Sequence, residues 1–363
     1  MSDKLNKSGV LNKINEYNNN HNIKYVHKFN LRKNILNKNI INKDSQKEEK
    51  NEGDNIKYEK INSNLMDIIS EDKIDDLSKN CPIPSFEDKD YSYIGSLGEG
   101  SFGKIYLVED KKTKEQYALK KVICKDYQEL LKFKKEFELL YSLKNHINIM
   151  KIYKLQIKSL DITTSCLYVL MERAQNDWNL EIHRRIIARK FYRENEIIEI
   201  LKQITSGLYY LQKNKIAHRD IKPQNILIYP NNIYKIADLG EAKSILNNRI
   251  QMATLRGSEL FMSPLLYNGL KYSKKNIRHN PFKSDMFSLG YCFLYAICLN
   301  LKVLEYIREM TDMNNIENMV NKFIDKGKYS DKLIHLIYKM IELDEDKRLD
   351  FEQLEKEIKA NFK

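Results

Sequence analysis

KIAHRDIKPQNILIYPNNIYKIADLGEAK, residues 215–243, carries the densest chemical information in the chain. Two apolar runs, residues 226–228 and 233–237, flank a turn with one proline and two asparagines, which predicts a hairpin of two short buried strands. The hairpin would bring Asp220, just before it, close to Asp238, just after it, with Asn225 at its start. Carboxylate and amide oxygens held by short strands suit a hard divalent cation. The segment therefore predicts a centre that handles metal and phosphate.

A second informative segment is YSYIGSLGEGSFGKIYLVED, residues 91–110, in which two alternating strands flank a glycine-rich turn. Gly98, Gly100 and Gly103 allow the backbone to lie close to phosphate groups, with its N–H groups available as donors. The dinucleotide-binding fingerprint requires a strand followed by a helix. The position of this turn between two strands therefore argues against a Rossmann fold.

HRDIKPQN followed by DLG, downstream of the glycine-rich turn and of the strand EQYALKKVI, resembles the eukaryotic protein kinases of the serine/threonine type. The resemblance implies an α+β, bilobal protein kinase-like fold, with a small antiparallel β-sheet lobe that carries one major helix and a larger, mainly helical lobe. It divides the chain into an Asn/Lys-rich extension (1–85), a linker (86–90) and a kinase domain (91–360). The two lobes would span about 91–171 and about 175–360.

The resemblance also implies the chemical roles. Asp220 would accept or orient the proton of the substrate hydroxyl, and Lys222 would neutralise the gamma phosphate. Asn225 and Asp238 would hold magnesium ions, because a hard cation prefers oxygen ligands. His218 is assigned to packing, since Asp220 already fills the role of the base.

Lys120 would hold the alpha and beta phosphates of ATP, with Glu136 from the following helix, residues 126–144, as its partner. Glu138 stays an alternative partner, because the stretch before HINIM appears one residue longer than usual. The ATP site would lie between the lobes, with Met171 as gatekeeper and Asp177 within reach of the ribose. Its expected residues are Leu97, Gly98, Gly100, Ser101, Gly103, Ile105, Ala118, Lys120, Met171, Glu172, Ala174, Asp177 and Leu227.

Regulation is expected in the loop of residues 244–264. Arg219, directly before Asp220, is typical of kinases that are controlled by phosphorylation of this loop. Thr254 lies four residues before Ser258, where such kinases carry the activating phosphate, and a phosphate there could pair with Arg219. An upstream kinase or autophosphorylation would supply it. An ordinary exposed threonine is the alternative interpretation.

Two features depart from the family pattern. Leu265 in SPL stands where the family has a glutamate that pairs with a late arginine, here Arg348, so either the site is wetter or another acid such as Glu259 replaces it. KYSKKNIRHN, residues 271–280, is a basic insertion that either selects substrates or is simply a loop.

Composition bounds the remaining possibilities. The formal charge of +12 lies entirely in residues 91–363, because residues 1–50 (+6) and 51–90 (−6) cancel. A solvated basic face is the simpler interpretation of this charge, and no nucleic acid beyond a nucleotide is expected. Residues 1–85 hold too little apolar surface to order by themselves, apart from a candidate amphipathic helix at 61–77.

Five scattered cysteines favour a reducing, intracellular location, cytoplasmic or nuclear. The apolar run 289–299 is too short to span a bilayer, so membrane insertion is not expected. The sequence thus predicts an ATP- and magnesium-dependent kinase that phosphorylates serine or threonine of protein substrates. A nucleotide-binding pseudokinase scaffold is the first alternative, and a small-molecule phosphotransferase on a related fold is the second.

Overall fold

The computed structural model describes residues 90–362, except residues 101–102, 144, 246–250 and 326. All of these residues belong to one compact unit, Ile83–Lys363. The predictions for the extension, for most of the linker and for Ser101 lie outside the described residues.

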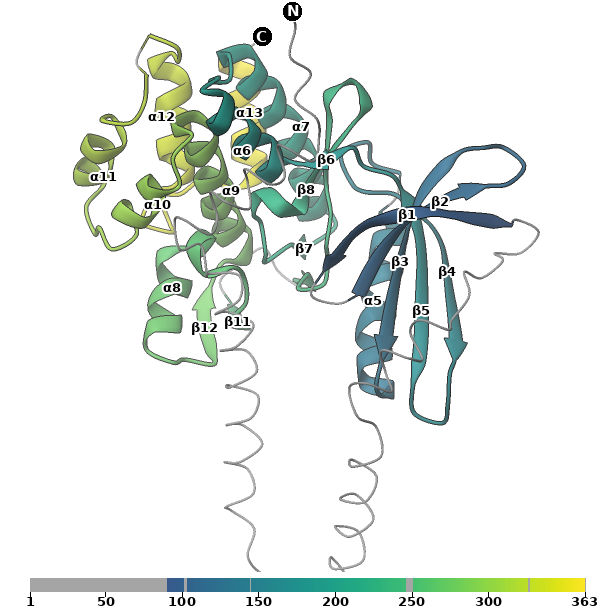
Figure 1. Cartoon of the computed structure of the whole chain (residues 1–363). Coiled ribbons are helices and arrows are strands. Elements are labelled where there is room, and N and C mark those ends of the chain that lie inside the picture. Colours follow the sequence, from purple (N-terminus) through teal and green to yellow (C-terminus); the bar gives the residue numbers. More distant parts are fainter. Residues whose placement is uncertain (1–89, 101–102, 144, 246–250, 326, 363) are drawn as a thin grey trace, which may run out of the picture. The chain divides into compact units, whose positions relative to one another are not determined.

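The smaller lobe is a five-stranded sheet with the order β1-β2-β3-β5-β4, in which every neighbouring pair is antiparallel (Figure 1). Its strands are β1 (Tyr91–Gly100), β2 (Gly103–Asp110), β3 (Gln116–Cys124), β4 (Ile152–Ser159) and β5 (Ser165–Glu172). Each strand enters the sheet next to its predecessor except β4, which lies at the edge beyond β5. The expected antiparallel lobe is confirmed.

Helix α5 (Tyr127–Ser142) packs against one face of this sheet, next to β3, β4 and β5 (Figure 1). It begins at Asp126, whose carboxylate caps the first-turn N–H groups of Gln128 and Glu129 at 2.7 and 2.9 Å. Phe133, Phe137 and Leu140 recur at helical spacing and are buried against the sheet. The apolar stripe of α5 thus fixes which side chains the helix turns toward the site.

The larger lobe is mainly helical. Its helices are α6 (Trp178–Ala188), α7 (Glu194–Lys213), α8 (Pro264–Lys271), α9 (Pro281–Cys298), α10 (Lys302–Ile307), α11 (Met313–Val320), α12 (Asp331–Met340) and α13 (Phe351–Asn361). Helix α9 is buried along nearly its whole length and forms the centre of this lobe. None of the described helices combines the length and the apolar character needed to cross a membrane.

Short strands complete the larger lobe. β6 (Asn176–Asp177), β8 (Ile226–Tyr229) and β9 (Ile233–Ile236) form one sheet, with the short turns η1 (Pro223–Asn225) and η2 (Pro230–Asn232) before and between the last two strands. β7 (Ile216–Ala217) pairs with β10 (Lys243–Ser244), and β11 (Gln251–Thr254) pairs with β12 (Asn276–His279). The short turn η3 (Glu259–Phe261) precedes α8. The hairpin predicted from residues 226–237 is present as β8 and β9.

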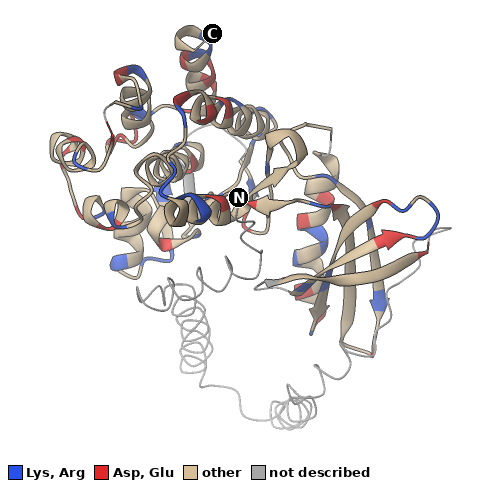
Figure 2. Cartoon of the chain, turned by 45° about the horizontal axis from the view of Figure 1, so that its top comes forward, with Lys and Arg blue, Asp and Glu red and all other residues tan. Residues whose placement is uncertain are grey.

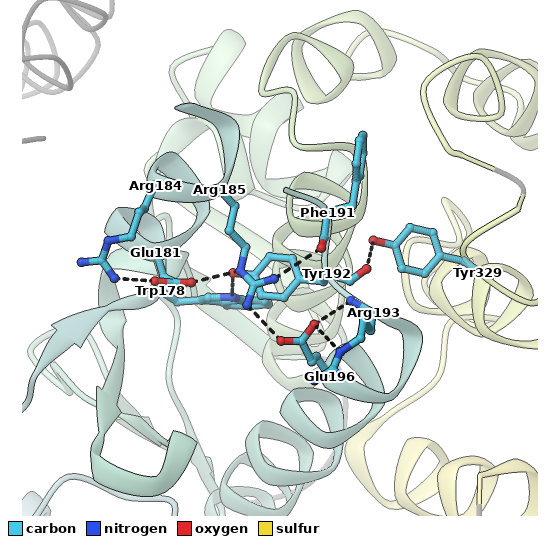
Figure 3. A network of polar contacts seen from close by, with 9 residues as sticks. All are labelled: Trp178, Glu181, Arg184, Arg185, Phe191, Tyr192, Arg193, Glu196 and Tyr329. Carbon is cyan, nitrogen blue, oxygen red and sulfur yellow. Dashed lines mark hydrogen bonds and ion pairs between the residues drawn. The ribbon is translucent and has the colours of Figure 1, made fainter. Parts of the chain in front are cut away.

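A partly buried cation, the Arg185 guanidinium, joins helices α6 and α7 (Figure 3). The Arg185 guanidinium donates to Glu181 Oε1 and Glu196 Oε1, both at 3.0 Å, and lies 3.7 Å from the centre of the Tyr192 ring. Tyr192 also accepts a hydrogen bond from the Trp178 indole at 3.1 Å. Because two carboxylates and an aromatic ring satisfy this arginine, the turn between the helices is held in a single arrangement.

The two lobes are linked by the backbone of β9. The Met150 N–H donates to the Ile236 carbonyl at 2.8 Å, and the Ile236 N–H donates to the Asn148 carbonyl at 2.9 Å. The side chain of Lys235, also in β9, pairs with Glu172 at the end of β5 at 2.7 Å. The hairpin that precedes Asp238 is therefore anchored to the smaller lobe as well as to the larger one.

Two strands of the larger lobe were not expected. Residues 251–254 of the long loop form the strand β11, and the basic insertion supplies its partner, β12. Arg348 precedes α13, whose N-terminus carries a capping box formed by Asp350 and Gln353. Figure 2 shows Lys and Arg interspersed with Asp and Glu on both lobes, which fits a solvated basic face.

Candidate active site

Asp285 of α9 holds the backbone of the loop that precedes β8, at His218 and Arg219. Its Oδ2 accepts the His218 N–H at 2.7 Å, and its Oδ1 accepts the Arg219 N–H at 2.8 Å. Arg219 has a φ of +69°, which is uncommon for a residue other than glycine. Because Asp285 is buried, the two hydrogen bonds keep this strained backbone in one conformation.

His218 lies inside the loop with both ring nitrogens engaged. Its Nε2 donates to the Ala237 carbonyl at 3.0 Å, and its Nδ1 accepts the Asp220 N–H at 3.3 Å. One nitrogen donates and the other accepts, which describes a neutral imidazole. The geometry gives His218 a structural place, in line with its assignment to packing.

Asp220 is the centre of the polar contacts. Its Oδ1 accepts the N–H and the hydroxyl of Ser258, both at 2.8 Å, and its Oδ2 accepts the Lys222 ammonium at 2.7 Å. Lys222 also donates to the Ser258 hydroxyl at 2.9 Å. Burial alone would raise the pKa of Asp220, but the charge and hydrogen bond of Lys222 and the hydrogen bond of Ser258 lower this pKa below its ordinary value. The carboxylate is therefore ionised at neutral pH.

Asn225 and Asp238 lie at neighbouring ends of the hairpin, since the Ala237 N–H donates to the Asn225 carbonyl at 2.9 Å. The Asn225 side-chain N–H group donates to the Asp220 carbonyl at 2.8 Å, which directs its amide oxygen elsewhere. Asp238 has a φ of +60°, and its Oδ1 accepts the Gly240 N–H at 3.3 Å. Two oxygens that carry few competing hydrogen bonds fit magnesium better than a soft metal.

Glu136 of α5 is buried and faces the same loop. A Cβ atom placed on Gly240 would lie 3.2 Å from Glu136 Oε2 and 3.1 Å from Asp238 Oδ1. Burial raises the pKa of Glu136 to about 7, and the charge of Lys120 opposes this rise. The Lys120 ammonium lies 5.5 Å from the centre of the Phe137 ring. Among the described residues, no ion pair within 4.0 Å joins Lys120 to Glu136, so they are neighbours rather than the closed pair that was expected.

Glu138, the alternative partner, points elsewhere. Its side chain is 58% exposed and lies 3.7 Å from Lys134 on the same helix. Burial and orientation therefore leave Glu136 as the carboxylate of α5 that faces Lys120 and the DLG loop.

The strand registers bring the expected nucleotide residues together. Gly98 lies opposite Ile105, Ile105 opposite Lys120, and Ala118 opposite Met171. A Cβ atom on Gly103, which has a φ of +148°, would lie 2.0 Å from the Lys121 carbonyl oxygen. Only glycine fits this position, at which the hairpin turns back to Gly100.

On the side of the larger lobe, Asp177 lies opposite Leu227 in the pairing of β6 and β8. The Asp177 carboxylate accepts the Leu180 N–H at 2.8 Å and so caps helix α6. Glu172 ends β5, and Arg173 and Ala174 follow it into the segment that connects the lobes. The structure thus brings Asp177 and Leu227 together and gives Asp177 a structural task as the cap of α6.

Arg219 and the unmodified Thr254 are in direct contact. The guanidinium of Arg219 donates to the Thr254 hydroxyl at 3.0 Å and also to the Thr254 carbonyl. Arg256 lies in the same region and pairs with Glu241 at 3.1 Å. The exposed Thr254 hydroxyl is therefore bound to one arginine and has a second one two residues away.

Residues 91–357 match the family described as the protein kinase domain. The chain belongs to this family. It is 30% identical over 262 residues to serine/threonine-protein kinase Nek4 of Mus musculus, which covers 69% of this chain and 30% of that protein. It is 34% identical over 272 residues to a probable serine/threonine-protein kinase, nek3, of Dictyostelium discoideum, which covers 71% of this chain and 22% of that protein.

A third relative is calcium-dependent protein kinase 4 of Plasmodium berghei, 32% identical over 263 residues, or 69% of this chain and 46% of that protein. The chain thus spans less than half the length of these three curated relatives.

Sequence reasoning did not assign three residues that organise this kinase domain. Ser258 serves in the sequence to locate Thr254, and its contact with Asp220 is not predicted. Asp285 is given no role, although a carboxylate close to a long apolar run is itself a signal. Arg308 carries no signal in the sequence, because its partners are backbone carbonyl groups.

Arg348 corrects the expectation about Leu265. Its guanidinium donates to the carbonyl oxygens of Glu342, Lys283 and Leu343 at 2.6, 3.0 and 3.1 Å. Burial lowers its pKa to about 10, and the nearby Glu345 opposes this shift. Neither a wetter site nor Glu259 is needed, because carbonyl groups satisfy this buried cation.

Proposed function

We propose that this chain is an ATP- and magnesium-dependent protein kinase that transfers the gamma phosphate to serine or threonine residues of protein substrates. The observation that carries the proposal is the arrangement around Asp220, a partly buried, ionised carboxylate that accepts hydrogen bonds from both Lys222 and Ser258. Phosphoryl transfer needs alignment and charge neutralisation more than covalent participation. This arrangement supplies both.

Each residue then has a task. Asp220 accepts the hydroxyl proton of the substrate, and Ser258 holds the carboxylate in one orientation so that its other oxygen remains beside Lys222. Lys222 provides positive charge where the gamma phosphate would lie, and Lys120 does so for the alpha and beta phosphates. Asn225 and Asp238 would hold magnesium, which neutralises phosphate charge when bound.

The same proposal includes ATP between the lobes, against the residues brought together by strands β1, β2, β3, β5 and β8. We also propose an intracellular location, cytoplasmic or nuclear, supported by the buried free thiols of Cys124, Cys292 and Cys298. The protein substrate would be met at the segment that carries Ser258.

The test is phosphate transfer from labelled ATP to a mixed protein or peptide substrate, with and without magnesium. Label on phosphoserine or phosphothreonine, dependent on magnesium, is the expected result. Tight ATP binding without any transfer would instead support the pseudokinase scaffold, and label only on small molecules would support the small-molecule phosphotransferase.

Glu136→Gln is expected to lower kcat/KM for ATP about tenfold, which corresponds to ~1.4 kcal/mol of transition-state stabilisation. Glutamine keeps the size of the side chain but removes the negative charge that Glu136 can place next to Lys120, which acts on Lys120 at a distance because these two described residues form no direct ion pair. Glu138→Gln is the matched control on the same helix, because this side chain is exposed and pairs only weakly with Lys134. Steady-state kinetics on both variants measures the difference, and equal effects would remove Glu136 from the site.

Thr254→Ala is expected to lower kinase activity by about tenfold or more, because a phosphate on Thr254 would form charge-assisted hydrogen bonds to Arg219 worth ~1.5 kcal/mol or more. Mass spectrometry of the active protein should find the phosphate at Thr254. Thr163→Ala, on the exposed turn between β4 and β5, serves as the control. Unchanged activity together with an unmodified Thr254 would show that this threonine is an ordinary loop residue.

A further inference from the structure

The segment from Ser258 to Met262 connects the ligand of Asp220 to helix α8. It includes the turn η3 (Glu259–Phe261), which begins with a hydrogen bond from the Phe261 N–H to the Ser258 carbonyl at 2.9 Å. Ser258 binds Asp220 through both its N–H and its hydroxyl. Contacts that hold this turn in place therefore also hold Ser258 against the Asp220 carboxylate.

Arg308, one residue after α10, reaches into this turn. Its guanidinium donates to the Leu260 carbonyl at 2.7 Å, to the Met262 carbonyl at 3.0 Å and also to the Glu259 carbonyl. The Ser288 hydroxyl donates to the Phe261 carbonyl at 2.7 Å. Every carbonyl group from residue 259 to residue 262 thus accepts a hydrogen bond from one of two side chains.

The surroundings of Arg308 hold it in place. The guanidinium lies 4.0 Å from the centre of the Tyr267 ring of α8, so it is stacked as well as hydrogen-bonded. The planar fork of arginine can serve several acceptors at once, which a lysine ammonium on a flexible chain does less well. Burial lowers the pKa of this guanidinium, while Tyr291 and Tyr267 oppose the shift, and the group stays charged at neutral pH.

Arg348 does not supply this anchor. Its donors are used on carbonyl groups of Glu342, Lys283 and Leu343, and the side chain of Leu265 is 42% exposed. The family pattern implies an ion pair between the residue at position 265, in α8, and a late arginine. Leu265 and Arg348 do not form it.

We infer that Arg308 is a positioning residue that holds the Ser258–Met262 segment so that Ser258 stays on Asp220. The inference rests on the proposed kinase function only for its catalytic consequence. The anchoring of the segment itself follows from the hydrogen bonds and the stacking of Arg308.

Hydrogen exchange on the full chain tests the anchor directly. Arg308→Lys keeps the charge but loses the fork, and we expect amide exchange of residues 258–263 to become about tenfold faster, with the five-stranded sheet unchanged. Arg184→Lys is the control, because this exposed arginine pairs with Glu181 on the same helix, α6. Unchanged exchange in the segment would overturn the inference, and so would equal acceleration over the whole chain.

Kinetics tests whether Arg308 acts through Ser258. Arg308→Lys and Ser258→Ala should each lower kcat/KM for the protein substrate about tenfold while KM for ATP changes less than about twofold. The double variant should have about the same kcat/KM as each single variant, because both substitutions weaken the same contact, that between Ser258 and Asp220. Additive losses would contradict the inference. If the unmodified chain transfers no phosphate, the proposed function fails, and the exchange experiment still decides on the anchor.

Discussion

Asp220→Asn is expected to lower kcat by about 10²- to 10⁴-fold, the range that a positioned general base contributes. Asparagine has nearly the same shape and can still accept the hydrogen bond from Ser258. Its amide group, however, would place N–H donors toward Lys222, whose ammonium lies 2.7 Å from Asp220 Oδ2 in the unmodified protein. The substitution thus removes the base and also the negative charge that holds Lys222.

ATP affinity should change little in this variant, because the glycine-rich turn and Lys120 are untouched. Calorimetry with ATP and steady-state rates with a protein substrate separate the two effects. Asp331→Asn, an exposed carboxylate in the first turn of α12, is the matched control and should behave like the unmodified protein. A variant that kept its full rate would exclude Asp220 as the base.

The catalytic loop could be predicted because its information is local. The apolar runs that became β8 and β9 lie within 11 residues of each other, Ile226 to Ile236, and their pairing brings Asn225 and Asp238 to neighbouring ends. A hairpin depends on few distant contacts, so periodicity and turn residues are sufficient. The same reasoning placed the glycine-rich turn between β1 and β2.

The anchors of the loop could not be predicted in the same way. Asp285 acts on N–H groups 66 and 67 residues away, and Arg308 acts on carbonyl groups 46 to 49 residues away. Their partners are backbone groups, which every residue has, so no residue type in the sequence marks them. The expectation for Arg348 was wrong for this reason: an acidic side chain was expected as its partner, but its hydrogen bonds go to backbone carbonyl groups.

The strand β12 was missed for a related reason. Within NIRH only Ile277 and His279 are buried, so the alternation is short and half of its buried positions are polar. Its partner β11 lies more than 20 residues earlier, and Thr254 pairs with Asn276 at the end of the ladder. Edge pairing of such short polar strands is set by the fold around them and not by their own pattern.

Asp285→Ala is expected to lower the free energy of unfolding by about 2–6 kcal/mol, because one buried and one partly buried N–H group each lose their acceptor at ~1–3 kcal/mol. Those N–H groups belong to His218 and Arg219, directly before Asp220. Arg219, with its positive φ, would relax toward an ordinary backbone conformation, and Asp220 would lose its fixed direction. Activity should therefore fall even at temperatures at which the variant is folded.

Asp285→Asn distinguishes these contributions, since the amide oxygen can still accept one of the two N–H groups while its own N–H group faces the other. We expect a loss of about 1–3 kcal/mol, intermediate between the unmodified protein and the alanine variant. Denaturant unfolding with Asp331→Ala as the control measures the order of the four proteins. If Asp285→Asn were as stable as the unmodified chain, the paired hydrogen bonds could not be what holds the catalytic loop, and the strained Arg219 backbone would need another support.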